Sequence, residues 1–378
     1  MFEKIEALIQ NDDVYGENSE DHYEPLFNAA LHEAVERHYS QCREYRNYLE
    51  YNHFHSDQIT ENFDLEQLPW LLINIFKEWE LLSVEREKIL HHFTSSGTTG
   101  QKSQIFFDEG SFSRGLRMVT QTFKAHSLYN PSLAVNYLLF ADQPTEQNRK
   151  GTAYTDMNIT RMTAQHEIFY ALRGSATGST FAEDETLATL KRFAEQAPLY
   201  PLRIVGFPAF LYRTVKHLET SRTQLSLGSQ SFILTGGGWK TENQALSKQE
   251  LISYFSHWLG IPESNIRDSY GMVEHGVPYV ECEQHHLHIP IYARALVRNF
   301  WDLTPSPMGE PGLLQLITPY MTSQPNVSLL TLDKAIMSQR CQCGRRAPYI
   351  EILGRAAIRK NKGCALSTLD LLPGEKAA

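Results

Sequence analysis

Residues 94–103 read TSSGTTGQKS, a run of small residues that ends with Lys102 and Ser103. Gly97 and Gly100 lack a Cβ, so the backbone at these positions can adopt positive φ and approach a ligand closely. Hydroxyl groups and a lysine ammonium are hydrogen-bond donors, and successive backbone N–H groups in such a loop can surround an anion. The stretch is therefore typical of a phosphate-binding loop, although its composition alone fits an ordinary surface turn equally well.

The composition is that of an ordinary folded protein. Of the 378 residues, 42% are hydrophobic and 21% are charged, which provides enough apolar material for a large core. The length predicts one large domain with an appendage, or two unequal domains. The formal net charge of -9 argues against a general nucleic-acid-binding protein.

The cysteines and the apolar segments predict a cytoplasmic protein that does not insert into a membrane. Five cysteines, an odd number in a chain of this length, indicate reduced thiols instead of a disulfide framework. Residues 1–13 carry acidic side chains where a signal peptide would carry basic ones. The longest apolar stretches, such as residues 138–141, have the length of a strand and cannot span a bilayer.

The spacing of apolar residues predicts helices first and alternating strands and helices later. Residues 23–49 and 70–90 carry apolar side chains at helical spacing. Strands are then predicted at 136–140, 202–205, 231–234 and 265–269, and helices at 184–196, 209–218 and 242–259, the last one stopped by Gly260. This alternation predicts an α/β fold with a parallel sheet covered by helices. Ligands bind at the carboxyl ends of strands in such sheets, so the segments at Gly206, Gly236 and Gly271 should converge.

The region after residue 303 changes character. Strands are predicted at 312–318, 328–332 and 349–353, with a Cys-Gln-Cys-Gly turn before the last of them. We therefore expect a large domain at 1–353 and a short C-terminal arm at 354–378.

The glycine loop is not a Walker A sequence, because the Gly-x-x-x-x-Gly-Lys-Ser/Thr spacing is absent. It resembles instead the phosphate-binding signature of the adenylate-forming superfamily. Other stretches match that superfamily in the same order: TGGG at 235–238, YGMVE at 270–274, GEPG at 309–312 and GR at 354–355. The fold class implied is an adenylate-forming large domain with parallel sheets covered by helices and a truncated C-terminal lid.

This resemblance implies ATP and Mg²⁺ as cofactors and gives each matching residue a role. Tyr270 would lie against the adenine, Glu274 would approach the Mg²⁺, and Asp333 and Arg355 would reach the ribose. Thr99, Lys102, Glu274 and Cys364 are the expected catalytic residues. The expected nucleotide-binding residues are Ser95, Ser96, Gly97, Thr98, Thr99, Gly100, Lys102, Gly236, Gly237, Gly238, Tyr270, Gly271, Asp333 and Arg355.

The chain departs from the superfamily pattern in three places. Leu332 precedes Asp333 where the superfamily usually has glycine, and Val273 replaces a threonine. Only residues 356–378 follow Arg355, where the superfamily has a lid of about a hundred residues that supplies a catalytic lysine. Neither Lys360 nor Lys362 is assigned to that role.

The short C-terminal region and Cys364 resemble the acyl-protein synthetases of the bacterial luminescence fatty acid reductase complex. These ligases activate a long-chain fatty acid as acyl-AMP and move the acyl group to a cysteine near the C-terminus as a thioester. The resemblance implies a fatty acid reductase subunit and an acyltransferase of the same complex as partners. The positive charges of Arg359, Lys360 and Lys362 would favour the Cys364 thiolate. An unreactive cysteine in a frayed tail is the alternative.

Two further sets of residues are candidates for binding. Phe207 and Pro208 precede the expected adenine turn, where the superfamily builds its acid pocket, although Phe207 fits an ordinary core position equally well. Cys282, His288, Cys341 and Cys343 could bind a structural Zn²⁺ with tetrahedral geometry. The histidines near Cys282 could instead be solvated polar residues of a hairpin.

Two other functions remain open at this point. One is an acyl- or aryl-CoA ligase of the phenylacetate type, in which Cys364 has no role. The other is a non-catalytic subunit that binds a nucleotide or an acyl group. The sequence contains no Gly-x-Ser-x-Gly elbow, so a hydrolase triad is not expected.

Overall fold

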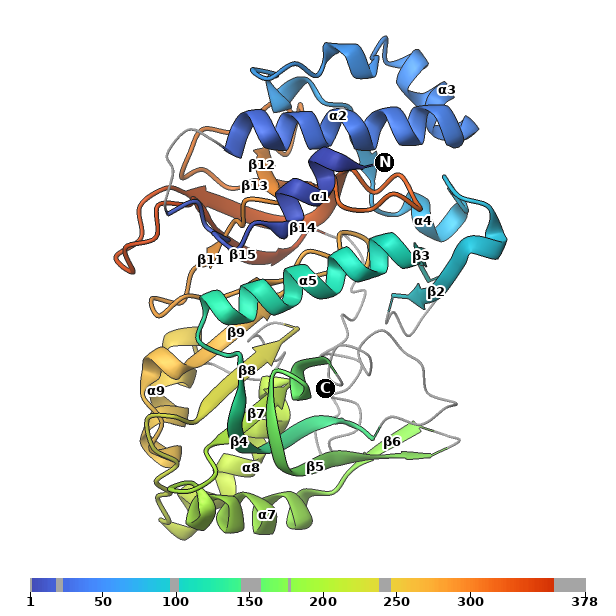
Figure 1. Cartoon of the computed structure of the whole chain (residues 1–378). Helices are drawn as coiled ribbons and strands as arrows, with labels where there is room; N and C mark the ends of the chain where they lie inside the picture. The colour runs from blue at the N-terminus through green and yellow to red at the C-terminus, as the bar shows by residue number, and fades with distance from the viewer. Residues whose placement is uncertain are drawn as a thin grey trace, which may run out of the picture.

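The computed structural model describes residues 2–17, 23–95, 102–143, 158–175, 178–237 and 246–356, which form two large sheets and one two-stranded sheet, with helices around them (Figure 1). The first sheet has the strand order β10-β9-β8-β7-β4-β5-β6. Its central strands β9, β8, β7, β4 and β5 are parallel, and the edge strands β6 and β10 are antiparallel to their neighbours. The strands are β4 (Asn130–Asp142), β5 (Thr163–Ser175), β6 (Gly178–Phe181), β7 (Leu202–Gly206), β8 (Phe232–Gly236), β9 (Ile266–Tyr270) and β10 (Tyr279–Val280).

Helices cover both faces of the parallel sheet. In β4, Leu138 and Phe140 pack on one face with α7 (Glu183–Gln196), α8 (Pro208–Ser221) and α9 (Lys248–Leu259). Side chains of β4 that alternate with these pack on the opposite face against Phe123 of α5 (Glu109–Ala125). This alternation is the period-two pattern of a strand that is buried on both faces. The α/β fold with a parallel sheet covered by helices is therefore confirmed.

The second sheet is mainly antiparallel and contains the strands predicted after residue 303. Its order is β11-β15-β14-β13-β12, and β1 joins β14 as a parallel edge partner. The members are β1 (Leu71–Leu72), β11 (Leu287–His288), β12 (Arg294–Arg298), β13 (Gly312–Ile317), β14 (Ser328–Ser338) and β15 (Tyr349–Arg355). Antiparallel pairing arises because loops, and not crossover helices, connect β12 to β15. Helices α1 (Glu3–Gln10) and α2 (Tyr23–Gln41) pack over this sheet, and α3 (Arg43–Tyr51) follows them (Figure 1).

The predicted helix at 70–90 is wrong. The segment instead contains β1, the one-turn helix α4 (Ile75–Glu78), the 3₁₀ turn η3 (Arg86–Lys88) and the start of β2 (Ile89–Thr94). Leu71 and Leu72 pair with β14, so tertiary strand pairing determines the local conformation here.

The predicted helix at 242–259 is correct in type but begins later, at Lys248 in the described region. Ser247 caps it, because the Ser247 side chain accepts from the Glu250 N–H and the Glu250 carboxylate accepts from the Ser247 N–H. Gly260, with a φ of 64°, ends the helix as predicted. Among the described residues, no helix is both long and apolar enough to cross a membrane.

The strand register brings the glycine segments together. Gly206 at the end of β7 pairs with Thr235 of β8, and Gly236 pairs with Ser269 of β9. The three carboxyl ends therefore lie side by side, and their predicted convergence is confirmed.

We expect Gly312→Ala to destabilise the protein more than Gly309→Ala. A Cβ at Gly312 would lie 2.2 Å from the Arg298 carbonyl oxygen. This oxygen is a backbone atom, so it cannot move aside as the end of a flexible side chain can. Gly309 has a φ of 88° but open space around it. Chemical denaturation should show a loss of about 3 kcal/mol for Gly312→Ala and about 1–2 kcal/mol for Gly309→Ala. Equal losses would contradict the packing described for β12 and β13.

Candidate nucleotide site

The carboxyl edge of the parallel sheet carries glycines at positions where a side chain would be crowded or the backbone strained. A Cβ at Gly236 would lie 3.2 Å from the Ser269 hydroxyl, so a side chain would crowd this turn. Gly237 follows with a φ of 82°, which favours glycine. Gly271 continues from β9 next to this turn. Gly238, which was also expected to bind the nucleotide, lies outside the described residues.

Tyr270, Asp333 and Arg355 meet at one point, although they come from three strands. The Tyr270 hydroxyl donates to Asp333 Oδ2 at 2.8 Å, and Arg355 Nε lies 3.3 Å from Asp333 Oδ1. Asp333 and Arg355 are register partners in β14 and β15, whereas Tyr270 ends β9 of the other sheet (Figure 1). The carboxylate therefore connects the two sheets, with each of its oxygens held by a different partner.

The local environment keeps Tyr270 protonated. Burial raises the pKa of Tyr270 far above its usual range, and the negative charge of Asp333 raises it further. The hydroxyl is consequently a permanent donor to the carboxylate. The Arg355 side chain is 60% exposed and can contact both the carboxylate and a ligand.

Glu274 lies in the turn that follows Gly271 and is buried. Its carbonyl oxygen accepts a hydrogen bond from the Asn326 side chain. The next residue but one, Gly276, has a φ of 71°, and a Cβ there would overlap the Tyr320 hydroxyl. The backbone that carries Glu274 is thus held against the segment around residues 320–326.

The glycine loop connects the antiparallel strands β2 and β3 (Gln104–Asp108). Ser95 and Ser103 close its base, because the Ser103 N–H donates to Ser95 Oγ at 3.0 Å and the Ser95 N–H donates to the Ser103 carbonyl. Lys102 is exposed at the end of the loop. Ser96, Gly97, Thr98, Thr99 and Gly100 lie outside the described residues, as does Cys364.

A buried polar segment between β13 and β14 was not predicted from the sequence. Gln324 accepts from the Phe106 N–H at 3.0 Å and donates to the Gln104 carbonyl at 3.1 Å, and thereby fixes β3. Two residues later, Asn326 fixes Glu274. The glycine-loop hairpin and the Glu274 turn are therefore fixed to the same strip of chain. Polar residues between Pro319 and Pro325, in an otherwise apolar region, were the available signal.

Phe207 and Pro208 follow β7 at the same edge of the sheet. Pro208 is the first residue of α8 and is buried, a position that suits proline because the N–H there has no helical partner. Phe207 is partly buried and packs against the core beneath α7–α9. Their role as an acyl pocket remains a prediction.

Behind the site, two carboxyl groups lie close to each other. The Glu281 carboxylate accepts from the Asp268 N–H at 2.8 Å and forms an ion pair with Lys248. Thr235, the residue before Gly236, donates to Asp268 Oδ1 at 3.0 Å. Burial, together with the negative charge of Glu281, raises the pKa of Asp268 above its usual range.

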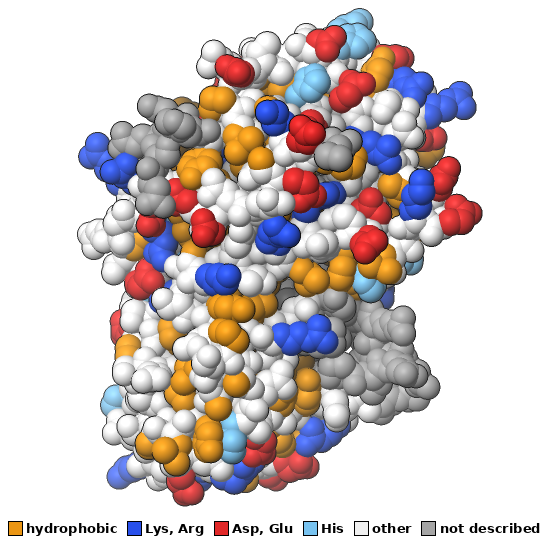
Figure 2. All heavy atoms as spheres, viewed as in Figure 1, with side chains coloured by type: hydrophobic (Ala, Val, Ile, Leu, Met, Phe, Trp, Pro, Cys, Tyr) orange, Lys and Arg blue, Asp and Glu red, His pale blue; other side chains and the backbone are white. Residues whose placement is uncertain are grey.

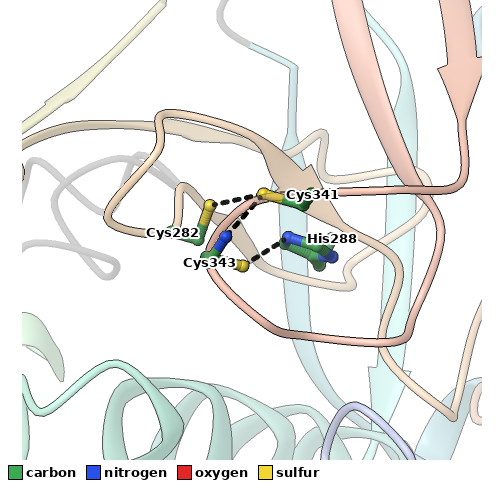
Figure 3. Close-up of side chains that lie close together, drawn as sticks. All are labelled: Cys282, His288, Cys341 and Cys343. Carbon is green, nitrogen blue, oxygen red and sulfur yellow. Dashed lines mark hydrogen bonds between the residues drawn. The ribbon is translucent and has the colours of Figure 1, made fainter.

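The four candidate zinc ligands lie close together. Cys282 follows β10, His288 is in β11, and Cys341 and Cys343 are in the connection from β14 to β15 (Figure 3). One donor atom from each side chain lies within 4.8 Å of those of the other three. The cluster is separate from the contacts among Tyr270, Asp333 and Arg355, so it does not belong to the nucleotide site.

Comparison with solved structures defines the class of protein. The chain superposes on an open conformation of 2-hydroxyisobutyryl-CoA ligase in complex with 2-HIB-AMP and CoA, with a TM-score of 0.67, 14% identity, and coverage of 87% of this chain and 74% of that chain. The postadenylation state of the same ligase with 2-HIB-AMP gives the same TM-score over 91% of this chain and 70% of that chain. The fold is that of the adenylate-forming ligases.

Sequence comparison then identifies the family. The family model described as "Acyl-protein synthetase, LuxE" matches residues 2–372, so the chain belongs to the acyl-protein synthetases. Two relatives are each named long-chain-fatty-acid--luciferin-component ligase. The one from Aliivibrio fischeri is 27% identical, over 90% of this chain and 87% of its own. The one from Vibrio harveyi is 28% identical, over 88% and 85%.

We expect Asp268→Asn to change how stability depends on pH. In the wild type, the folded state holds an extra proton between about pH 4 and the raised pKa of Asp268, so this group's contribution to stability is lost as the pH rises through that range. The asparagine variant has no carboxyl group at this position, so it does not lose stability in this way. Its free energy of unfolding relative to the wild type should therefore rise from pH 4 to pH 8, by about 1.4 kcal/mol for each unit by which the folded protein raises the pKa of Asp268.

Urea denaturation at several pH values measures this difference. Glu195→Gln, at an exposed position on α7, is the matched control and should show no such trend. If the difference in free energy of unfolding between Asp268→Asn and the wild type does not change with pH, the close approach of the two carboxyl groups is contradicted.

Proposed function

We propose that this protein uses ATP to activate a long-chain fatty acid as acyl-AMP and then transfers the acyl group to its own Cys364. Family membership and the names of the relatives support the substrate and the type of ligase. The adenylate-forming fold supports the first step. The observation that carries the proposal is the meeting of Tyr270, Asp333 and Arg355 beside the glycine turn of β8.

The Asp333 carboxylate is suited to bind a ribose. Its two oxygens provide about four acceptor sites, of which Tyr270 and Arg355 use one each. The remaining lone pairs can accept from the two vicinal ribose hydroxyls. Hydrogen bonds to a charged acceptor contribute about 1.5–3 kcal/mol each, and the fixed orientation of Asp333 avoids the entropic cost of ordering it on binding.

The purine would lie at the carboxyl edge of the sheet. Tyr270 provides an aromatic ring, and Gly236 and Gly237 leave the backbone uncovered on the neighbouring strand. Aromatic rings form favourable offset or edge contacts with other rings. Ribose and base would thereby be recognised by residues of the two sheets.

Glu274 fits a Mg²⁺ site, because its carboxylate is a hard oxygen ligand and its backbone is fixed by Asn326. Mg²⁺, when bound with ATP, would neutralise charge that develops on the phosphates. The glycine loop between Ser95 and Lys102 would donate N–H and hydroxyl groups to the same phosphates, as its composition indicates.

The chemistry needs two displacements. An oxygen of the fatty acid carboxylate attacks the α-phosphorus of ATP, and the bond to pyrophosphate breaks. The thiolate of Cys364 then attacks the acyl carbonyl carbon, a thioester forms, and AMP leaves with the anhydride oxygen. Splitting the transfer in this way replaces a poor leaving group by a good one.

We further propose that the residues after β15, which ends at Arg355, carry the thioester to a fatty acid reductase subunit, in a complex with an acyltransferase. The basic residues before Cys364 would keep its thiol partly ionised. A reactive thiol and the free cysteines of the described region suit the reducing cytoplasm. No residue of the cysteine–histidine cluster takes part in these steps.

We expect Asp333→Asn to raise the KM for ATP about tenfold or more, because the amide removes the charge that ribose hydroxyls would contact. Fatty-acid-dependent exchange of pyrophosphate into ATP measures this directly. Asp302→Asn, at an exposed loop position, should leave the KM unchanged. If both variants behave like the wild type, Asp333 does not bind the nucleotide.

We expect Cys364→Ser to make acyl-AMP but to retain no acyl group. The full chain is incubated with ATP, Mg²⁺ and tetradecanoic acid and then examined by peptide mass spectrometry. The wild type and Cys42→Ser should each gain one hydroxylamine-sensitive acyl group on the peptide that contains residue 364. Acylation that survives in Cys364→Ser, or turnover that requires coenzyme A, would contradict transfer to Cys364.

A further inference from the structure

We propose that Cys282, His288, Cys341 and Cys343 bind one structural Zn²⁺, which fixes the β14–β15 connection to the segment that carries β11. Three thiols and one imidazole form a common ligand set for structural zinc. All four side chains point toward one another (Figure 3), and their donor atoms lie within 4.8 Å of one another. This inference is independent of the proposed adenylation.

The distances are near those that one tetrahedral ion requires: the Cys282–Cys341 spacing fits, and the Cys343–His288 spacing is shorter. Cys282 Sγ and Cys341 Sγ are 3.7 Å apart, and Cys343 Sγ is 3.2 Å from His288 Nε2. Zinc bonds of about 2.3 Å to sulfur and about 2.0 Å to nitrogen put tetrahedral ligand atoms about 3.5–3.8 Å apart. A disulfide would require about 2.05 Å between sulfurs, so the Cys282–Cys341 pair has the spacing of metal ligands.

Neighbouring groups orient each donor. His288 Nδ1 lies 2.7 Å from the Ala347 carbonyl oxygen, to which it can only donate, so in the neutral ring Nε2 carries the lone pair that faces Cys343. The Gln284 N–H donates to Cys282 Sγ, and the Cys343 N–H donates to Cys341 Sγ, each at 3.4 Å. Backbone donors of this kind stabilise thiolates.

The charges around the cluster are opposite in sign to the net charge of a site with bound Zn²⁺. Binding Zn²⁺ to three thiols releases three protons and leaves the ion with its ligands at a net charge of -1. Arg267 and Arg345 flank Glu283 at 3.2 and 2.7 Å, which gives this trio a net charge of +1. Glu283 follows Cys282 directly in the sequence, which brings this trio next to the cluster. The positive charge therefore lies where the negative site would need it.

One neighbouring histidine needs to be distinguished from the ligands. His286 Nδ1 lies 3.2 Å from Cys341 Sγ, but the His286 ring stacks on Tyr349 with centroids 4.1 Å apart, and Nε2 faces Glu351. We assign His286 to the surroundings of the ion and His288 to its ligands.

The site would act on the strand pair that ends in the nucleotide site. His288 pairs with Tyr349 at the start of β15, and the same strand ends at Arg355, whose register partner is Asp333. A Zn²⁺ ion bound beside the beginning of β15 would stabilise the register that brings Arg355 to Asp333.

Metal analysis of the full chain tests the proposal. Protein purified without a histidine tag should contain about one zinc per chain by mass spectrometry of the metals. Cys341→Ser with Cys343→Ser should lose the zinc, and His288→Ala should lose most of it. Cys42→Ser and His286→Ala should each keep it. Zinc that is retained in His288→Ala and lost in His286→Ala would overturn the ligand assignment.

Two measurements on the wild type keep the test independent of whether the variants fold. A strong chelator should remove the metal and lower the Tm by about 5 °C or more, and added Zn²⁺ should restore it. Co²⁺ in place of zinc should give the visible spectrum of a tetrahedral thiolate site. Protein that contains no zinc and takes none up, an iron–sulfur chromophore, or a Cys282–Cys341 disulfide in reduced preparations would overturn the proposal. Pyrophosphate exchange, measured in parallel, reports the adenylation separately.

Discussion

The Asp333 carboxylate, held between the Tyr270 hydroxyl and the Arg355 guanidinium, is the contact on which the candidate site depends. Tyr270 belongs to the parallel sheet, whereas Asp333 and Arg355 lie on paired strands of the antiparallel sheet. The proposed ribose position therefore exists only where the two sheets are docked. Desolvation makes the Tyr270 bond the stronger of the two, because exposure of Arg355 screens its ion pair.

A second constraint fixes the glycine-loop hairpin and the Glu274 turn relative to each other. The buried segment with Gln324 and Asn326 holds the strand after the glycine loop and the turn of Glu274 through side-chain hydrogen bonds to backbone groups. An unpaired buried amide costs about 1–3 kcal/mol, so these bonds are costly to break. The residues proposed to bind phosphate and Mg²⁺ are thus positioned by one strip of polar side chains between two buried strands.

Sequence patterns predicted what depends on local signals. Short apolar runs followed by glycine marked β7 and β8, and Gly260 marked the end of α9, because strand burial and helix termination leave signatures within a few residues. Contacts distant in sequence were not predictable in this way. Leu71 and Leu72 form a strand only because β14 pairs with them, and Asn326 reaches Glu274 across 52 residues. Asp333 and Arg355 were found through motif order, and their contact with Tyr270 required the fold.

A crystal structure of the full chain with a non-hydrolysable analogue of a long-chain acyl-adenylate would test the proposed nucleotide site. We expect ribose hydroxyls within hydrogen-bonding distance of Asp333, with the purine between Tyr270 and the backbone of Gly236 and Gly237. An analogue bound elsewhere, or a ribose remote from Asp333 while the Tyr270–Asp333 bond remains, would contradict it.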